Sequence, residues 1–147
     1  MTESTLGSSF VDRGLLSIAM NGGLAWSKSY PFTGTDGICY FNLTTPSVQT
    51  YGLGFKVVEG EGDDIPQMLF DKGPILTSNF KVMQDFIDYS TGIYMSDACN
   101  QGTSGLFNHT LLIIGFGVDQ TDLGPVKYWL VQNSWGTGWG LSGYAKI

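Results

Sequence analysis

The sequence predicts an α+β fold in which short antiparallel strands and tight loops outnumber helices. Of the 147 residues, 14% are aromatic and 21 are glycine, a mixture that favours packed rings, short strands and turns over long helices. Two apolar runs in the second half, "TLLIIGFG" and "KYWLVQN", have the length and composition of neighbouring strands. The chain length fits one domain, or two small half-domains that share a cleft.

The first half is predicted to be rich in loops. Residues 1–25 are mixed and contain an "NGG" turn at Asn21 to Gly23. The stretch "YPFTGTDGICYF" has the proline and glycine punctuation of a loop. The next stretch, "VQTYGLGFKVVEG", alternates enough to form one or two strands. A soft boundary near residues 55–65 therefore divides the chain into residues 1–55 and 56–147.

The second half reads as an antiparallel β unit with few helices. "DDIPQMLFDKGP" begins with acids and a proline and stops at Gly73 and Pro74, which predicts one short helix. "ILTSNF" and "FIDYSTGIYM" are rich in the aromatic and β-branched residues that are typical of strands. "GYAKI" is expected to form a last short strand.

Composition argues against several classes of function. The net charge of −6 would repel nucleic acid, and the chain has no basic patch or apolar run of about 18 residues, so we expect neither nucleic-acid nor membrane partners. One histidine and two distant cysteines cannot close a zinc site, and no glycine-rich phosphate loop is present, so we expect no metal and no cofactor. The few cysteines and the lack of a visible signal peptide favour an intracellular location.

The chemistry is concentrated at His109 and Asn133. His109, the only histidine, opens the first apolar run, and Asn133 closes the second. If Gly117 pairs with Lys127, His109 lies opposite Trp135 and about one cross-strand step from Asn133. An amide oxygen can orient an imidazole base without adding a charge. The alternative is a histidine without a catalytic role, whose hydrogen bonds are made within a β core.

These residues carry a resemblance to a known family. "NHTLLIIGFG", "YWLVQNSWGTGWG" and "GYAKI" resemble the C-terminal half of papain-like cysteine proteases, the cathepsin family. "NGGLAW", "YPFTGTDGIC", "GPILTSNF" and "FIDYSTGIYMSDAC" extend the resemblance over residues 20–147. It implies one papain-like peptidase domain of two lobes, with a reduced left lobe in residues 1–55 and a mostly antiparallel β right lobe in residues 56–147. It also allows a lysosomal or secreted location.

The resemblance also implies a role for each site residue. His109 would be the general base and acid, and Asn133 its orienting partner. The substrate cleft would be lined on its primed side by Trp135 and Trp139. On the unprimed side the substrate backbone would bond to Gly22 and Gly23, and the main specificity pocket would lie near Leu24, Ala25 and Thr110.

The family's nucleophile is missing from its usual context. In this family a cysteine within a C-G-S-C-W motif lies about 130–150 residues before the histidine, but only 108 residues precede His109. Neither Cys39 nor Cys99 stands in such a motif. Both match positions that form structural disulfides in the family, but cysteines are absent at the partner positions. Whether these two thiols are free is left open by the sequence.

The segment "ESTLGSSF", residues 3–10, fits the gap best. It places Ser9 on the nucleophile and Glu3 on the glutamine of the oxyanion hole. It also places Leu6 on one half-cystine, and the other half-cystine position holds Met20, so both ends of one disulfide would be replaced together. Ser9 lies only 12 residues before Asn21, so the left lobe is expected to lack its main helices.

Two functions follow from these substitutions. Serine forms no resting ion pair with imidazole, and a carboxylate at Glu3 would oppose a developing oxyanion. The first hypothesis is therefore an inactive pseudoprotease that serves as a structural or binding subunit, with protein partners in a larger assembly. The alternative is an active peptide-bond hydrolase that takes peptide or protein substrates, with His109 as the base.

Overall fold

The computed structural model describes residues 11–35, 37–42, 47–49, 64–77, 80–96, 109–122 and 124–147. The chain divides into two compact units, Met1–Val58 and Glu59–Ile147, and each is described by itself. No helix in the described ranges has the length and apolarity needed to cross a membrane.

The first unit contains one short helix and a two-stranded sheet. Helix α1 spans Val11–Met20, and strands β1 (Gly23–Ala25) and β2 (Ser47–Gln49) pair in antiparallel fashion. The helix ends at the expected "NGG" turn, where Gly22 has a φ of 72° that favours glycine. The sequence predicted a left lobe without its main helices, and this lobe has only the ten-residue α1 in its described part.

The described part of the first unit exposes much of its apolar surface. None of its described apolar side chains is buried, and Phe32 and Ile38 are 97% and 91% exposed. Trp26, Leu24 and Met20 are also more than half exposed. The buried hydrophobic core of the described chain therefore lies in the second unit.

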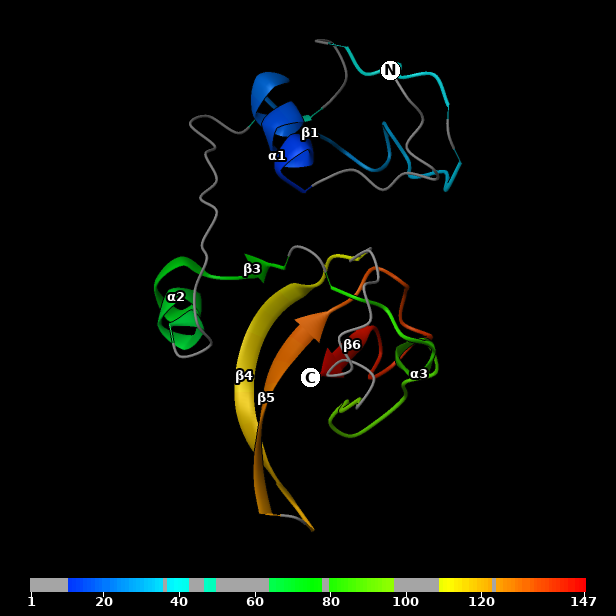
Figure 1. The fold of residues 1–147 in the computed structure, drawn as a ribbon. Coiled ribbons are helices and arrows are strands. Elements are labelled where there is room, and N and C mark those ends of the chain that lie inside the picture. The colour runs from blue at the N-terminus through cyan, green and yellow to red at the C-terminus, as the bar shows by residue number, and fades with distance from the viewer. Residues whose placement is uncertain are drawn as a thin grey trace. The chain divides into compact units, whose positions relative to one another are not determined.

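The second unit is built around a four-stranded antiparallel sheet. Its elements are α2 (Ile65–Lys72), β3 (Ile75–Leu76), α3 (Gln84–Ile87), β4 (Leu112–Thr121), β5 (Gly124–Gln132) and β6 (Tyr144–Lys146). The strand order is β3-β4-β5-β6. Figure 1 shows β4 and β5 as two long, curved neighbours, with the short β6 beside β5.

Most of the predicted elements of this unit are confirmed. The short helix, the two long strands and the last short strand form where the sequence placed them. The stretch "FIDYSTGIYM" does not begin as a strand, because its first two residues belong to helix α3. Phe86, within α3, and Tyr89, two residues after its end, are both buried in the core, so tertiary burial overrides strand propensity here.

The predicted register of the long hairpin is wrong beyond a bulge. Gly117 pairs with Tyr128, one residue away from the predicted Lys127. The cause is an irregularity between Ile113 and Gly115, where β4 carries one extra residue. Nearer the site, Ile113 pairs with Val131, which is the register predicted there. The ladder of β4 and β5 ends before the site, and His109 makes its backbone bridge to Phe80 instead of lying opposite Trp135.

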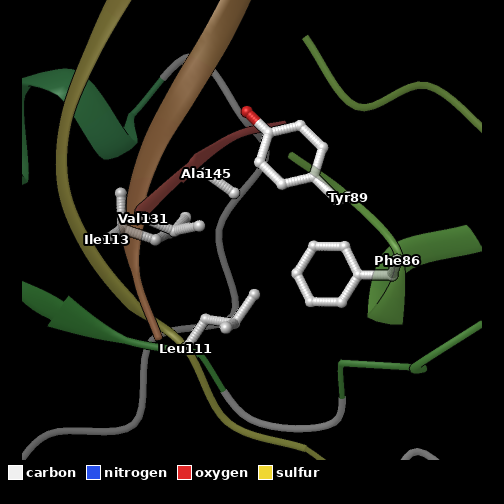
Figure 2. Packing of buried hydrophobic residues seen from close by; sticks show 6 residues of the cluster. All are labelled: Phe86, Tyr89, Leu111, Ile113, Val131 and Ala145. Carbon is white, nitrogen blue, oxygen red and sulfur yellow. The ribbon is translucent and has the colours of Figure 1, made fainter. Parts of the chain in front are cut away.

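Six buried side chains form the core of the second unit. They are Phe86, Tyr89, Leu111, Ile113, Val131 and Ala145. Figure 2 shows the two rings from the α3 segment facing the aliphatic side chains of the sheet and its ends. Phe86 and Leu111 are the largest fully buried side chains, so the core joins α3 to the start of β4.

The opposite end of the hairpin is held by a charged pair. Lys146 Nζ of β6 donates to Asp119 Oδ2 of β4 and lies 4.6 Å from the centre of the Tyr128 ring. The hydrogen bond to Asp119 raises the pKa of Lys146 above its ordinary value. Gly117 leaves room for Tyr128, because a Cβ there would come within 2.6 Å of the Tyr128 hydroxyl.

Replacing Gly140 by alanine should destabilise the second unit. Gly140 has a φ of 56°, and a Cβ there would lie 2.5 Å from the backbone oxygen of Tyr144. We expect Gly140→Ala to lower the free energy of unfolding by more than about 1 kcal/mol, measured by urea denaturation. Gly138→Ala is the matched control, because its Cβ meets nothing within 4 Å. Equal stability of the two variants would contradict this packing.

Candidate active site

His109 is fixed by backbone pairing just before β4. Its N–H donates to the Phe80 oxygen at 3.0 Å, and the Phe80 N–H donates back to the His109 oxygen at 2.8 Å. Two residues further on, the Leu111 N–H donates to the Thr77 hydroxyl at 2.9 Å. These bonds tie the segment before β4 to the segment after β3, so the half-buried imidazole projects from a rigid backbone.

Asn133 directly follows β5 and is almost fully buried. Its side chain is 8% exposed, and its backbone N–H donates to the Gly143 oxygen at 2.9 Å. Gly143 has a φ of 94° and donates its own N–H to the Trp139 oxygen at 2.7 Å. The "NSWGTGWG" loop thus folds back on itself and holds the asparagine at its base.

The two side chains meet through one hydrogen bond. His109 Nε2 and Asn133 Oδ1 lie 2.8 Å apart, and the same oxygen accepts the Ser134 N–H at 2.7 Å. A backbone N–H is always a donor, so the amide atom that faces it must be the oxygen. Consequently His109 Nε2 must carry the proton that it donates, and Nδ1 is left as the proton acceptor of the neutral ring.

The other amide atom of Asn133 lies in the interior of the second unit. Asn133 Nδ2 is buried, and no described residue accepts its protons. A flipped amide would turn Nδ2 toward the Ser134 N–H and place two donors face to face. The orientation of the Asn133 amide is therefore set by the Ser134 N–H.

Two tryptophans surround the pair. The ring centres of His109 and Trp135 are 5.0 Å apart with an interplanar angle of 31°, so Trp135 covers one face of the imidazole. Trp135 contacts Trp139 edge-on at 5.2 Å. The Trp139 indole N–H donates to the backbone oxygens of Phe86 and Ile87, at 3.2 and 3.0 Å. Four of the predicted site residues, His109, Asn133, Trp135 and Trp139, therefore form one connected cluster.

The remaining predicted cleft residues are Thr110 in the second unit and four residues in the first unit. Thr110 is half-buried and directly follows His109. Gly22 and Gly23 form the turn into β1 in the first unit, with φ values of 72° and 153°. In β1, Leu24 is exposed and Ala25 half-buried. These four residues of the first unit occupy a turn and a strand, and their roles at a cleft remain predictions.

The predicted nucleophile segment, residues 3–10, lies outside the described residues. Ser9 and Glu3 lie outside the described residues, as does Cys99. Cys39 is a free, exposed thiol in the loop of the first unit. Its side chain is hydrogen-bonded to Tyr30, which raises the pKa of that phenol. No group of three metal-ligating side chains occurs among the residues that the structure describes.

Two contributions to the site were not foreseen in the sequence. The Ser134 N–H, which sets the amide orientation, is a backbone group and has no sequence signal beyond its place after Asn133. Phe80 ends the stretch "ILTSNF", which was described only as typical of strands, yet its backbone anchors His109. Its place opposite His109 depends on a bridge between distant segments, which local patterns do not report.

Known proteins resemble this chain over most of its length. The family model described as "Papain family cysteine protease" matches residues 7–147. Cathepsin Q of Rattus norvegicus is 35% identical over 127 residues, which are 86% of this chain and 35% of that protein. Cathepsin L of Sarcophaga peregrina is 33% identical over 137 residues, which are 93% of this chain and 38% of that protein.

Solved structures agree with this relationship. A digestive procathepsin L2 proteinase from the larval midgut of Tenebrio molitor aligns with a TM-score of 0.78 and 31% identity. The alignment covers 95% of this chain and 41% of that one. The papain-like α+β fold predicted from the sequence is confirmed. The chain itself spans well under half the length of these relatives.

Replacing Asn133 by alanine should leave two donors unpaired. The His109 Nε2–H and the Ser134 N–H both lose their acceptor. We expect Asn133→Ala to lower the free energy of unfolding by about 1–3 kcal/mol in urea denaturation. Ser134→Ala is the control, since it keeps the backbone N–H and should change stability little. If both variants matched the parent chain, the shared acceptor would not exist.

Proposed function

The chain belongs to the papain family of cysteine proteases, and we propose that it is an inactive member that serves as a binding or structural subunit. The observation that carries the proposal is an oriented base without a cysteine partner of the family type. His109 and Asn133 are bonded at 2.8 Å, whereas neither Cys39 nor Cys99 stands in the C-G-S-C-W context of the nucleophile.

The chemistry explains why the substitution matters. In a cysteine protease the thiolate forms beside an imidazolium and attacks the peptide carbonyl. Serine at position 9 would need its proton removed by His109 Nδ1 during the attack, as in serine triads. Glu3 at the oxyanion position would place a negative charge where negative charge develops. Loss of a single oxyanion donor already lowers the rate roughly 10²–10³-fold.

A binding role is supported by the surface of the first unit. Phe32, Ile38 and Met20 are 97%, 91% and 79% exposed. Phe32 and Ile38 line the same surface pocket, and exposed apolar side chains that lie close together are typical of surfaces that contact other proteins. The first unit also lacks a buried apolar side chain in its described part, so association with a partner would supply the burial that its own residues do not.

An active hydrolase is the second candidate, and the same pair supports it. The imidazole is held in the tautomer that leaves Nδ1 free to accept a proton. Ser9, or a residue on a segment outside this chain, would then be the nucleophile, and the substrates would be peptides or proteins. His109 would accept the proton of the nucleophile and return it to the leaving amine.

Peptide hydrolysis distinguishes the two candidates. We expect turnover of a broad set of fluorogenic peptides by the full chain to be no faster than turnover by His109→Ala. Ser9→Cys alone should remain slow, because Glu3 still opposes the oxyanion. Ser9→Cys combined with Glu3→Gln should raise the rate by at least about 10²-fold over Ser9→Cys, the effect of one oxyanion donor.

The opposite results would favour the enzyme. Turnover by the parent chain that is lost in His109→Ala would show a working nucleophile. Additional loss in Ser9→Ala would identify that nucleophile as Ser9, while unchanged turnover in Ser9→Ala would place it elsewhere.

A further inference from the structure

Residues 42–44 of the first unit read Asn-Leu-Thr, which is an acceptor sequence, or sequon, for N-linked glycosylation. A sequon is an asparagine, then any residue except proline, then serine or threonine. The asparagine must also lie at the surface, because the attached oligosaccharide is bulky and hydrophilic. The Asn42 side chain is exposed, in a segment without helix or strand that precedes β2. Sequence and exposure therefore agree at this asparagine.

The chain contains a second sequon, Asn108-His109-Thr110, and this one runs into the candidate site. Asn108 itself lies outside the described residues. The backbone of His109 is bonded to Phe80 in both directions, and Thr110 is half-buried. The last two residues of this sequon are thus held in the fold of the second unit. We therefore expect modification at Asn42 and not at Asn108.

Aromatic rings directly precede the exposed asparagine. Tyr40 and Phe41 both contact Tyr30, at centre-to-centre distances of 4.2 Å and 6.4 Å. Tyr40 is 55% exposed, so part of this aromatic group faces water. The face of an aromatic ring carries partial negative charge and attracts the weakly positive C–H groups of a sugar ring. A sugar linked to Asn42 thus has a suitable surface within two residues of its attachment point.

The same aromatic group borders the most exposed apolar surface of the first unit. Tyr30 and Tyr40 line a pocket together with Phe32 and Ile38, and the last two are 97% and 91% exposed. An uncovered apolar surface of this kind favours aggregation. A hydrophilic oligosaccharide attached beside it would keep part of that surface out of contact with other molecules of the chain.

We propose that Asn42 is an N-glycosylation site whose oligosaccharide shields the aromatic surface around Tyr40. In the reaction, Asn42 Nδ2 attacks the anomeric carbon of an oligosaccharide carried on a lipid diphosphate. A C–N bond forms, the C–O bond to the diphosphate breaks, the lipid diphosphate leaves, and Nδ2 gives up one proton.

The proposal commits the chain to the lumen of the secretory pathway, where the lipid-linked donor and its transferase act. The few cysteines favoured an intracellular location, whereas the family resemblance allowed a lysosomal or secreted one, and the proposal selects the second. It goes beyond the proposed function, because it requires neither catalysis nor a protein partner.

Mass spectrometry of the chain isolated from its natural source tests the proposal directly. Peptide N-glycosidase in heavy-oxygen water releases the glycan and leaves a labelled carboxyl group where the glycosylated amide stood. We expect this label at Asn42 and an unmodified Asn108. An unmodified Asn42 in the natural chain would overturn the proposal. A glycan on Asn108 would overturn the structural argument that separates the two sequons.

Variants of the full chain show whether the sequon itself is recognised. A cleavable leader directs each variant into the secretory pathway of a eukaryotic host. We expect one glycan on the parent chain and none on Asn42→Gln. Thr44→Ala should also have none, although it retains the asparagine. Asn108→Gln is the matched control and should keep the glycan. A parent chain recovered without a glycan, or a glycan that persists in Thr44→Ala, would contradict the assignment.

The shielding role has a separate measurement. We expect Asn42→Gln from the same host to scatter more light than the glycosylated parent at equal concentration, because the exposed side chains around Tyr40 are then uncovered. Asn108→Gln should scatter light as the parent does. Equal scattering by Asn42→Gln and the glycosylated parent would overturn the shielding role.

Discussion

The second unit depends on one contact, the packing of the Phe86 side chain from α3 against the sheet. Its ring fills the space beside Leu111 and the strands, and its backbone oxygen accepts the Trp139 indole N–H. The same packing reaches the site, because Trp135 lies between Phe86 and His109. The core and the candidate site therefore share side chains and form one continuous cluster. The His–Asn pair is consequently weak evidence of activity by itself, because the side chains around it are also needed for the fold of the second unit.

The architecture of the second unit was largely predictable, because its signals are local. The strand runs, the Gly73–Pro74 stop and the final "GYAKI" strand each follow from composition and turn chemistry. Two features were not predictable in this way. The bulge between Ile113 and Gly115 shifts the register by one residue without a proline or a polar residue to mark it. Helix α3 forms where aromatic residues favoured a strand, because burial of Phe86 decides the local structure.

The candidate site was predicted by residue type and only in part by geometry. His109 and Asn133 were expected to meet across the long hairpin, and they do meet, but His109 is carried by a bridge to Phe80. The donor that fixes the amide, the Ser134 N–H, belongs to the backbone and is invisible in a sequence pattern. The assignment of Ser9 as the nucleophile remains a prediction. Its assignment depends on a short alignment, and no long-range pattern in the sequence strengthens it.

The central claim is that an oriented imidazole stands here without an activated cysteine. Alkylation by iodoacetamide at neutral pH, followed by mass spectrometry of the intact chain and its peptides, tests it most directly. The account predicts that Cys39 and Cys99 react at the slow rate of ordinary thiols, and at the same rate in His109→Ala. Fast alkylation of either cysteine that slows in His109→Ala would contradict it, because only a thiolate paired with the imidazole behaves in that way.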